Sequence, residues 1–185
     1  MAGCNSYYCN DLEEQVLTPC GENLAGGADQ AVVFQCGFEP TDPTDGTEVA
    51  ALIAAGNAVL FQNIKAGIAK PSPQDGTSLV AGQEARTQTY QRTGTWMDGN
   101  VNASSDPAYE VINNATGQRV GAVLWHLAEQ DAGLSIYANP YGGVAFKGGK
   151  NVPDDTNEPI RYEYDLSWRS KTDVQVITTP SGVFV

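Results

Sequence analysis

The sequence predicts a mainly β domain, an antiparallel β-sandwich or barrel with one or two short helices, that follows an extended N-terminal arm. Two observations predict this fold class. Stretches that alternate between apolar and polar residues recur along the chain, and short turns rich in Gly, Pro, Asn and Asp separate them. The chain has 185 residues, of which 41% are hydrophobic and 17% charged, and this composition suits one domain with a sizeable core.

Residues 1–29 are expected to form the arm, and residues 30–185 the β-sandwich domain. The arm shows no sustained hydrophobic period, and it ends in the polar, glycine-rich stretch GENLAGGADQ. The chain closes on the apolar stretch PSGVFV. Both end segments are expected to dock elsewhere, against another surface.

The four cysteines lie near the start of the sequence, at Cys4, Cys9, Cys20 and Cys36. Their spacing lacks the paired C-x2-C knuckles of structural zinc sites. Free thiols are the primary expectation, because a cytosolic chain keeps its thiols reduced. Two disulfides, or a site in which all four cysteines bind one metal ion, are the alternatives.

The first half of the domain is predicted to contain a strand, a helix and a second strand. Residues 31–38 are rich in β-branched and aromatic residues and predict a strand. Thr47 is expected to cap a short helix, with Glu48 in its first turn and Gly56 at its end. Residues 57–70 return to a period of two. Their expected buried face carries Ala58, Leu60, Ile64, Ala66 and Ile68.

Residues 86–96, RTQTYQRTGTW, favour a strand that is polar on both faces. Such a strand is weakly specified within its own monomer. We therefore expect it to be one arm of a long ribbon that contacts a neighbouring subunit; an exposed edge hairpin is the alternative. The candidate intersubunit residues are Thr87, Thr89, Tyr90, Gln91, Arg92, Thr93, Thr95 and Trp96.

The second half predicts one more helix and several strands. Asp106 and Pro107 suit the start of a helix that ends near Gly117. The apolar run 119–130 fits a buried strand better than a helix. Further strands are expected around residues 134–138 and 144–146.

The clearest strand signal is RYEYDLSW, residues 161–168, preceded by Ile160. Apolar and aromatic side chains alternate with charged ones, as in a strand with one buried and one wet face. The short connection 170–173 then predicts a hairpin between this strand and the following stretch, VQVITT.

The charge balance bears on partners and location. The net charge is −12, the pI is near 4.2, and Lys and Arg number only 10, so stable nucleic-acid binding is not expected. No apolar stretch is long enough to span a membrane, and no secretory signal is recognisable at the N-terminus. The protein is expected to be made in the cytoplasm and to remain there unless it leaves as part of a larger particle.

No pattern for catalysis stands out, so the chain is expected not to be an enzyme and to need no cofactor. The single histidine, His126, lies in an apolar run without a recognisable nucleophile. Asp42, Asp45 and Glu48 resemble a calcium loop superficially, but they do not match its register. A surface calcium site and a small hydrolase with an unrecognised active site are minor alternatives.

Residues 57–185 resemble virion structural proteins of tailed bacteriophages, most nearly the major tail tube subunit. The polar ribbon ARTQTYQRTGTWMDG, the helix after SSDPAYEVINN and the closing PIRYEYDLSWRSKTDVQVITT carry this resemblance. The N-terminal arm with its cysteines has no counterpart. The resemblance implies homo-oligomeric rings, hexameric for a tail tube, in which sheets of neighbouring subunits join and an acidic lumen repels DNA.

The resemblance also implies a place in the virion, contacts with other virion proteins, and synthesis in the cytoplasm of a host bacterium. A capsid decoration, neck or connector protein is the alternative of the same class. A carbohydrate- or ligand-binding β-sandwich is the alternative of another class. That module would use an exposed Trp96 or Tyr137 for stacking and the acidic loops for calcium.

Overall fold

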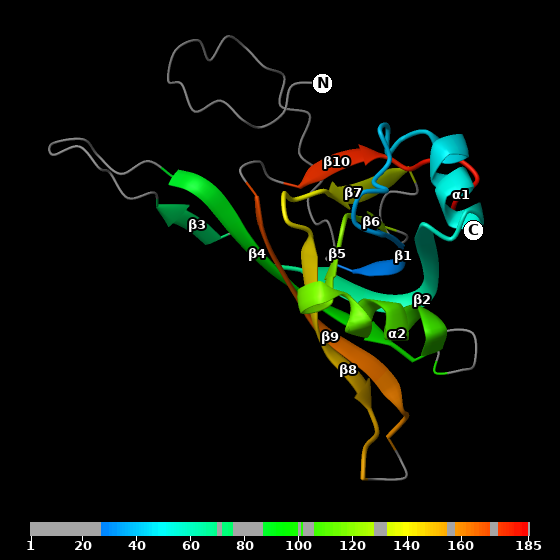
Figure 1. Ribbon diagram of the computed structural model, residues 1–185, viewed down its shortest axis with the longest axis vertical. Coiled ribbons are helices and arrows are strands. Elements are labelled where there is room, and N and C mark those ends of the chain that lie inside the picture. The colour runs from blue at the N-terminus through cyan, green and yellow to red at the C-terminus, as the bar shows by residue number, and fades with distance from the viewer. Residues whose placement is uncertain are drawn as a thin grey trace, which may run out of the picture.

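The structure is a computed structural model that describes residues 27–69, 72–75, 87–99, 101, 106–127, 133–154, 158–170 and 174–184. It is mainly antiparallel β-sheet with two helices, as the sequence predicted (Figure 1). The strands are β1 Ala28–Phe34, β2 Ala58–Ile68, β3 Ser72–Asp75, β4 Thr87–Asp98, β5 Arg119–Val120, β6 Val123–His126, β7 Leu134–Ala138, β8 Val144–Asn151, β9 Arg161–Ser170 and β10 Gln175–Thr178. The helices are α1 Gly46–Ala54 and α2 Asp106–Asn114, and a 3-10 turn follows α2 at Thr116–Gln118.

The strands of the described part of the chain belong to one sheet, in the order β10-β7-β6-β1-β2-β4-β9-β8-β5, with β3 paired to β4 beside this path. The sheet folds over on itself, because β5 at one end of the order runs directly into β6 near the other end. Gly121 lies between them and donates a hydrogen bond to the Phe34 carbonyl at 2.8 Å. A Cβ at Gly121 would lie only 2.9 Å from the Gln35 carbonyl oxygen, so this crossing requires glycine. The result is sandwich-like, with one main core between the two halves.

The main core is aromatic. Trp96, Trp125 and Trp168 are all buried, from β4, β6 and β9. Phe61 meets Trp96 edge-on at 5.3 Å between ring centroids, and Trp125 stacks on Trp168 at 5.8 Å. Large aromatic side chains supply much apolar burial for each ordered residue, so they stabilise the two halves against each other.

Strand β9 confirms the prediction drawn from its alternation. Tyr162, Tyr164, Leu166 and Trp168 are buried, and the residues between them are half-buried or exposed. Ile160, which was expected on the buried face, lies before the strand and is 44% exposed.

Strand β2 departs from the predicted single buried face. Ala58 and Leu60 pack in a second, smaller core with α1, whereas Ile64 and Ala66 pack in the main core. The change of side occurs at Asn63, whose φ of 58° is left-handed, and the pairing with β1 shifts register here. A β-bulge therefore turns the strand over, and the same alternation faces two different cores.

Helix α1 begins two residues earlier than predicted and has a different cap. Asp45, and not Thr47, is the N-cap residue: its carboxylate accepts a hydrogen bond from the Thr47 amide at 2.9 Å. Asp45 directly precedes the first helical residue, Gly46. Its side chain is therefore placed to accept from the amides of the first helical turn, which have no hydrogen-bond partner within the helix. Helix α1 covers the second core through Val49, Leu52 and Ile53.

The C-terminal segment docks on its own chain, and not elsewhere as expected. Val183 is buried in the second core, and the Phe184 ring stacks on His126 at 4.8 Å. The apolar residues that suggested an external partner therefore complete the fold of this chain.

The predicted hairpin between β9 and β10 is wrong. Strand β10 pairs with β7, with Val176 opposite Ile136. Both edges of β9 are already occupied, by β4 and β8. The final strand therefore pairs with β7 and forms one end of the sheet order.

The remaining predicted elements are confirmed with small shifts. Helix α2 begins at Asp106, and the apolar run 119–130 forms β5 and β6 in its described part. Strand β1 begins at Ala28, so the predicted arm loses its last two residues to the sheet; residues 1–26 lie outside the described residues.

Candidate functional site

The predicted ribbon is a long hairpin of this chain. Strands β2 and β3 pair with the same edge of β4, at residues 94–98 and 87–91 respectively. Strand β9 pairs with the opposite edge from Tyr90 to Asp98. Figure 1 shows the outer end of the β3–β4 hairpin projecting away from the body of the protein. Because both edges of β4 are paired along most of its length, a neighbouring subunit has to contact its side chains or the end of the hairpin.

The candidate ribbon residues divide between two environments. Thr93 and Thr95 are exposed, and Gln91 and Arg92 are half-buried. Arg92 donates a hydrogen bond to the Ala69 carbonyl at 3.2 Å. Thr87, Thr89 and Tyr90 lie in the outer part of β4, opposite Asp75, Gln74 and Pro73 of β3.

Trp96 is buried in the main core of this chain. It is 0% exposed, and its indole N–H donates to the Tyr109 hydroxyl at 2.9 Å. Its place in the intersubunit set is therefore corrected: Trp96 and Asp98 are buried on the side of β4 that faces the core of this chain. The sequence predicted a strand that is polar on both faces, because Arg92 and Gly94, on the same side as Trp96, are not apolar side chains.

Strands β2, β4, β9 and β8 form a layer whose outer side we call the polar face. Its inner side is the main core, and the described helices contribute to the two cores, not to this outer side. The face is hollowed over a volume of about 580 Å³ around Thr95, Lys147 and Asp165. The side chains that define it are Lys65, Thr93, Thr95, Lys147, Arg161, Glu163, Asp165, Ser167 and Arg169.

The polar face is mainly basic although the whole chain carries a net charge of −12. Lys65, Lys147 and Arg169 are exposed on it, against the single exposed carboxylate of Asp165. Arg161 and Glu163 form an ion pair, which lowers the pKa of Glu163, and Asn151 also donates to Glu163 at 3.1 Å. The acidic lumen implied by the resemblance is therefore not supplied by the described part of this face.

Helix α2 is fixed to the sheet by a buried hydrogen-bond chain. Tyr109 donates to the carboxylate of Asp98 at 2.7 Å, and Asp98 is 2% exposed. Burial and the neighbouring carboxylate raise the pKa of Tyr109, which keeps the phenol protonated and able to donate. The Tyr109 ring stacks on Tyr162 at 3.9 Å.

The start of α2 is fixed as well. Asp106 accepts hydrogen bonds from the Tyr162 hydroxyl and from the Lys150 ammonium group, the latter at 2.9 Å. Both bonds lower the pKa of Asp106, with that from Tyr162 the larger influence. The helix is thus attached to β8 and β9 at its first turn and to β4 one turn later.

An apolar cavity of about 1100 Å³ lies between α2, the adjoining ends of β1 and β2, and the turn from Asn139 to Gly143; we call it the α2 groove. Several apolar side chains around it are open to solvent: Val111 on α2 is 67% exposed, and Tyr141 is fully exposed. Cys36, an exposed free thiol, also lines the groove, with its sulfur 4.0 Å from the Arg119 carbonyl oxygen.

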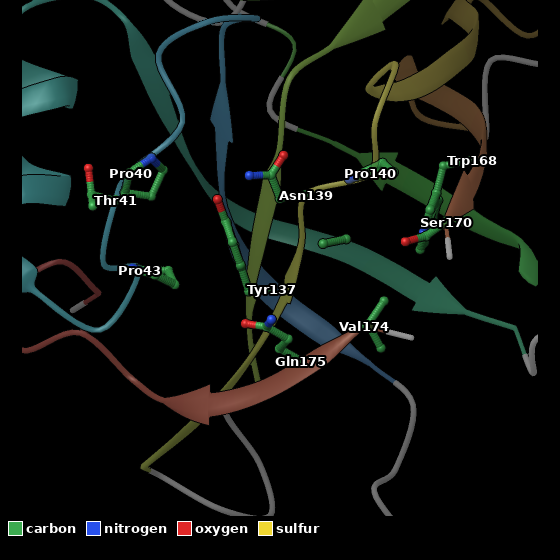
Figure 2. Close-up of a pocket in the computed structure, with 11 residues that line it drawn as sticks. Pro40, Thr41, Pro43, Tyr137, Asn139, Pro140, Trp168, Ser170, Val174 and Gln175 are labelled. Atoms are coloured by element: carbon green, nitrogen blue, oxygen red, sulfur yellow. The ribbon is translucent and has the colours of Figure 1, made fainter. Parts of the chain in front are cut away.

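A smaller pocket of about 260 Å³ lies beside β7 and β10 (Figure 2). Its lining includes Pro40, Tyr137, Asn139, Trp168 and Gln175. Figure 2 shows the Tyr137 hydroxyl directed toward the side where Pro40 and Asn139 lie. Burial, with a smaller influence of Glu39, raises the pKa of Tyr137 to about 12, so its phenol is neutral at physiological pH.

The aromatic residues proposed for ligand stacking are not available for it. Trp96 is 0% exposed and Tyr137 is 5% exposed. Trp168, which also lines the small pocket, is 3% exposed and already stacks on Trp125. The expectation of an exposed stacking platform at Trp96 or Tyr137 is therefore wrong.

The acidic loop before α1 is held together by its own carboxylates. Glu48 accepts hydrogen bonds from the amides of Asp42 at 2.9 Å and Thr41 at 2.8 Å, and these bonds lower its pKa. Asp42 in turn accepts from the Thr44 hydroxyl at 2.7 Å. Within the described ranges, no three Asp, Glu, His or Cys side chains gather in a way that would hold a metal ion.

Two further predictions concern single residues. His126 is half-buried, and its ring stacks on Phe184. Of the cysteines, Cys36 is free and exposed, and Cys4, Cys9 and Cys20 lie outside the described residues.

Comparison with known proteins does not assign the chain to a family. No family model, curated protein or solved structure matches it. Among the helices that the structure describes, none is long and apolar enough to cross a membrane.

Proposed function

We propose that this chain is a self-assembling structural subunit of a tailed-bacteriophage virion, and that it forms the stacked rings of a tail tube. One observation carries the proposal: a layer of long strands has its inner side in the core and its outer, polar face uncovered by the residues that the structure describes, and the hairpin β3–β4 extends beyond it. Such a layer can form one segment of the wall of a ring, with the polar face toward a water-filled channel.

The contact between subunits follows from the edges of this layer. Strand β5 pairs with β8 only at Val144 and Ala145, so residues 147–151 of β8 have no strand partner on that side among the described residues. On the hairpin, β4 continues beyond its pairing with β9, which ends at Tyr90, so residues 87–89 of β4 have no strand partner on that side among the described residues. The projecting hairpin of one copy would therefore meet the β8 edge of the next, a head-to-tail contact that closes into a ring.

The charge of the polar face favours a second candidate of the same class. A channel lined by Lys65, Lys147 and Arg169 would attract DNA phosphates, whereas a tail tube has to let DNA slide. A decoration, neck or connector subunit has no such requirement. It would use this basic face to dock on an acidic surface, such as that of another virion protein.

The experiment that tests assembly is a concentration series of the purified chain, followed by light scattering and electron microscopy. Rings or tubes of defined size support the proposal. The matched variants are Lys147→Glu with Arg169→Glu on the polar face, and Thr178→Glu on β10 as a control, since all three side chains are exposed. If the variant with both Lys147→Glu and Arg169→Glu still forms stacked tubes, the result supports a tail tube subunit. Loss of binding to an acidic virion partner, with rings intact, supports the decoration or connector role.

A further inference from the structure

We propose that the α2 groove is the docking site for the first ten residues of the N-terminal arm. This inference goes beyond the proposed function and does not depend on it. It rests on three observations: the groove is apolar and open, the arm offers a segment of matching chemistry, and the connection between them is long enough.

The groove combines size with solvent-exposed apolar side chains. Its volume of about 1100 Å³ exceeds that of the other cavities described above. Val111 is 67% exposed, Tyr141 fully exposed and Val59 38% exposed around it. Exposed apolar side chains that gather around one cavity mark a contact site more often than an ordinary surface. Glu39 and Glu110 lie at the same site, and Arg119 is the one cation among the described residues that line it.

The arm contains one stretch that suits this environment. Residues 1–10, MAGCNSYYCN, carry no charged side chain and include Tyr7 and Tyr8 next to each other. Residues 11–22 carry Asp11, Glu13, Glu14 and Glu22 with no Lys or Arg. Glu39 and Glu110 repel such a segment, so the acidic stretch is expected to stay in solvent and the uncharged stretch to enter the groove. Tyrosine suits a partly open apolar site because it buries a ring and leaves its hydroxyl in water.

The N-terminal arm is long enough to reach the α2 groove. It joins the sheet at Ala28, and the groove lies at the other end of β1, at Val33 and Phe34. Strand β1 spans about 20 Å, at about 3.3 Å per residue. The connection from residue 10 to residue 27 extends up to about 55 Å. The first ten residues can therefore occupy the groove of their own chain or that of a neighbouring copy.

The cysteines of the chain provide a direct test. Cys9 adjoins the Tyr7–Tyr8 pair, and Cys36 lines the groove. Docking brings these two thiols together. Cys20 is only eight residues from Ala28, so it belongs to the connecting segment and not to the docked one.

The experiment measures the effective concentration of the Cys9–Cys36 pair in a glutathione redox buffer, using the full-length chain with Cys4 and Cys20 changed to serine. The control has Cys36→Ser and Val152→Cys; Val152 is 62% exposed and does not line the groove. A flexible tether alone gives an effective concentration in the millimolar range. We expect Cys9–Cys36 to exceed the control pair at least tenfold, and Val111→Asp to remove that excess.

The outcomes separate the possible occupants. A disulfide within one chain places the arm on its own groove, and a disulfide between two differently tagged chains places it on a neighbour; both support the proposal. A Cys9–Cys36 pair that forms no better than the control overturns it. So does a Val111→Asp variant that abolishes a concentration-dependent dimer while Cys9 stays unreactive, because the groove would then bind a second copy directly. Ring formation is measured separately, so failure here leaves the assembly proposal untouched.

Discussion

The hydroxyl of Tyr109 on α2 lies 2.7 Å from the carboxylate of Asp98 on β4, and both groups are inside the protein. This hydrogen bond fixes the helix that forms one wall of the α2 groove to the strand that extends into the projecting hairpin. Trp96 donates to the same hydroxyl at 2.9 Å. The two surfaces to which we assign contacts are thus linked through one buried polar chain.

Replacing Tyr109 by phenylalanine tests this link. The change keeps the ring in the core and removes a donor from a buried carboxylate and an acceptor from the Trp96 indole. We expect a loss of about 1–3 kcal/mol in the free energy of unfolding, measured with urea. Tyr141→Phe is the control, because Tyr141 is fully exposed. Equal stability of the two variants would show that the buried chain contributes nothing net.

Acid is expected to weaken the attachment of α2 at Asp106. Hydrogen bonds from Tyr162 and Lys150 lower the pKa of Asp106 in the folded state, so the unfolded chain takes up its proton at a higher pH. The stabilisation by ionised Asp106 is therefore complete above the pKa that an aspartate has in the unfolded chain, about 3.9. It is lost as the pH falls through the lower pKa that Asp106 has in the folded protein. Unfolding curves of the wild type and of Asp106→Asn should differ at pH 6 and converge at low pH. A gap that stays constant would contradict this account.

The bulge at Asn63 gives a matched pair of substitutions. Its φ of 58° is left-handed, a conformation that glycine adopts freely and asparagine tolerates. Asn63→Ala should destabilise the protein by about 1–2 kcal/mol, because the Cβ penalty of the left-handed region applies. Asn63→Gly should change stability little. The midpoints of thermal unfolding of both variants make the comparison. An alanine variant as stable as the glycine variant would contradict a left-handed backbone conformation at position 63.

The C-terminal segment is expected to behave as part of the fold. Val183 is 5% exposed in the second core, whereas Val176 is 53% exposed on β10. Val183→Asp buries a charge without a partner and should lower stability by more than about 2 kcal/mol. Val176→Asp should have little effect. If the Val183 change were tolerated and instead blocked assembly, the segment would be serving a neighbour after all.

The sequence predicted elements whose signal is local. The alternation from Tyr162 to Trp168 predicted β9 and its buried face, because one side of a strand in a sandwich has to be apolar along its length. The two helices followed from their helix-forming residues and the turn residues around them, although the cap of α1 is Asp45 and not the predicted Thr47. A local pattern does not reveal where it is interrupted, however. The bulge at Asn63 keeps a period of two on both sides and changes only which core each side faces.

Partners of strands and segments were harder to predict. The short connection after Ser170 suggested a hairpin, but pairing depends on which edge is free, and that is a property of the complete sheet. Trp96 was assigned to a neighbour because the residues around it are polar, yet Phe61, Tyr109 and Phe146 complete its environment from distant positions. The α2 groove has no signal in the sequence, since it forms where α2, the β1–β2 ends and the Asn139–Gly143 turn meet.

The central claim is that the chain assembles through its projecting hairpin and the β8 edge. The most direct measurement is electron microscopy of the purified full-length chain at increasing concentration, with light scattering of the same samples. We predict particles with an open centre and a fixed number of subunits, which stack into tubes if the chain is a tail tube protein. A single chain per particle at every concentration would contradict the claim that the protein assembles with itself.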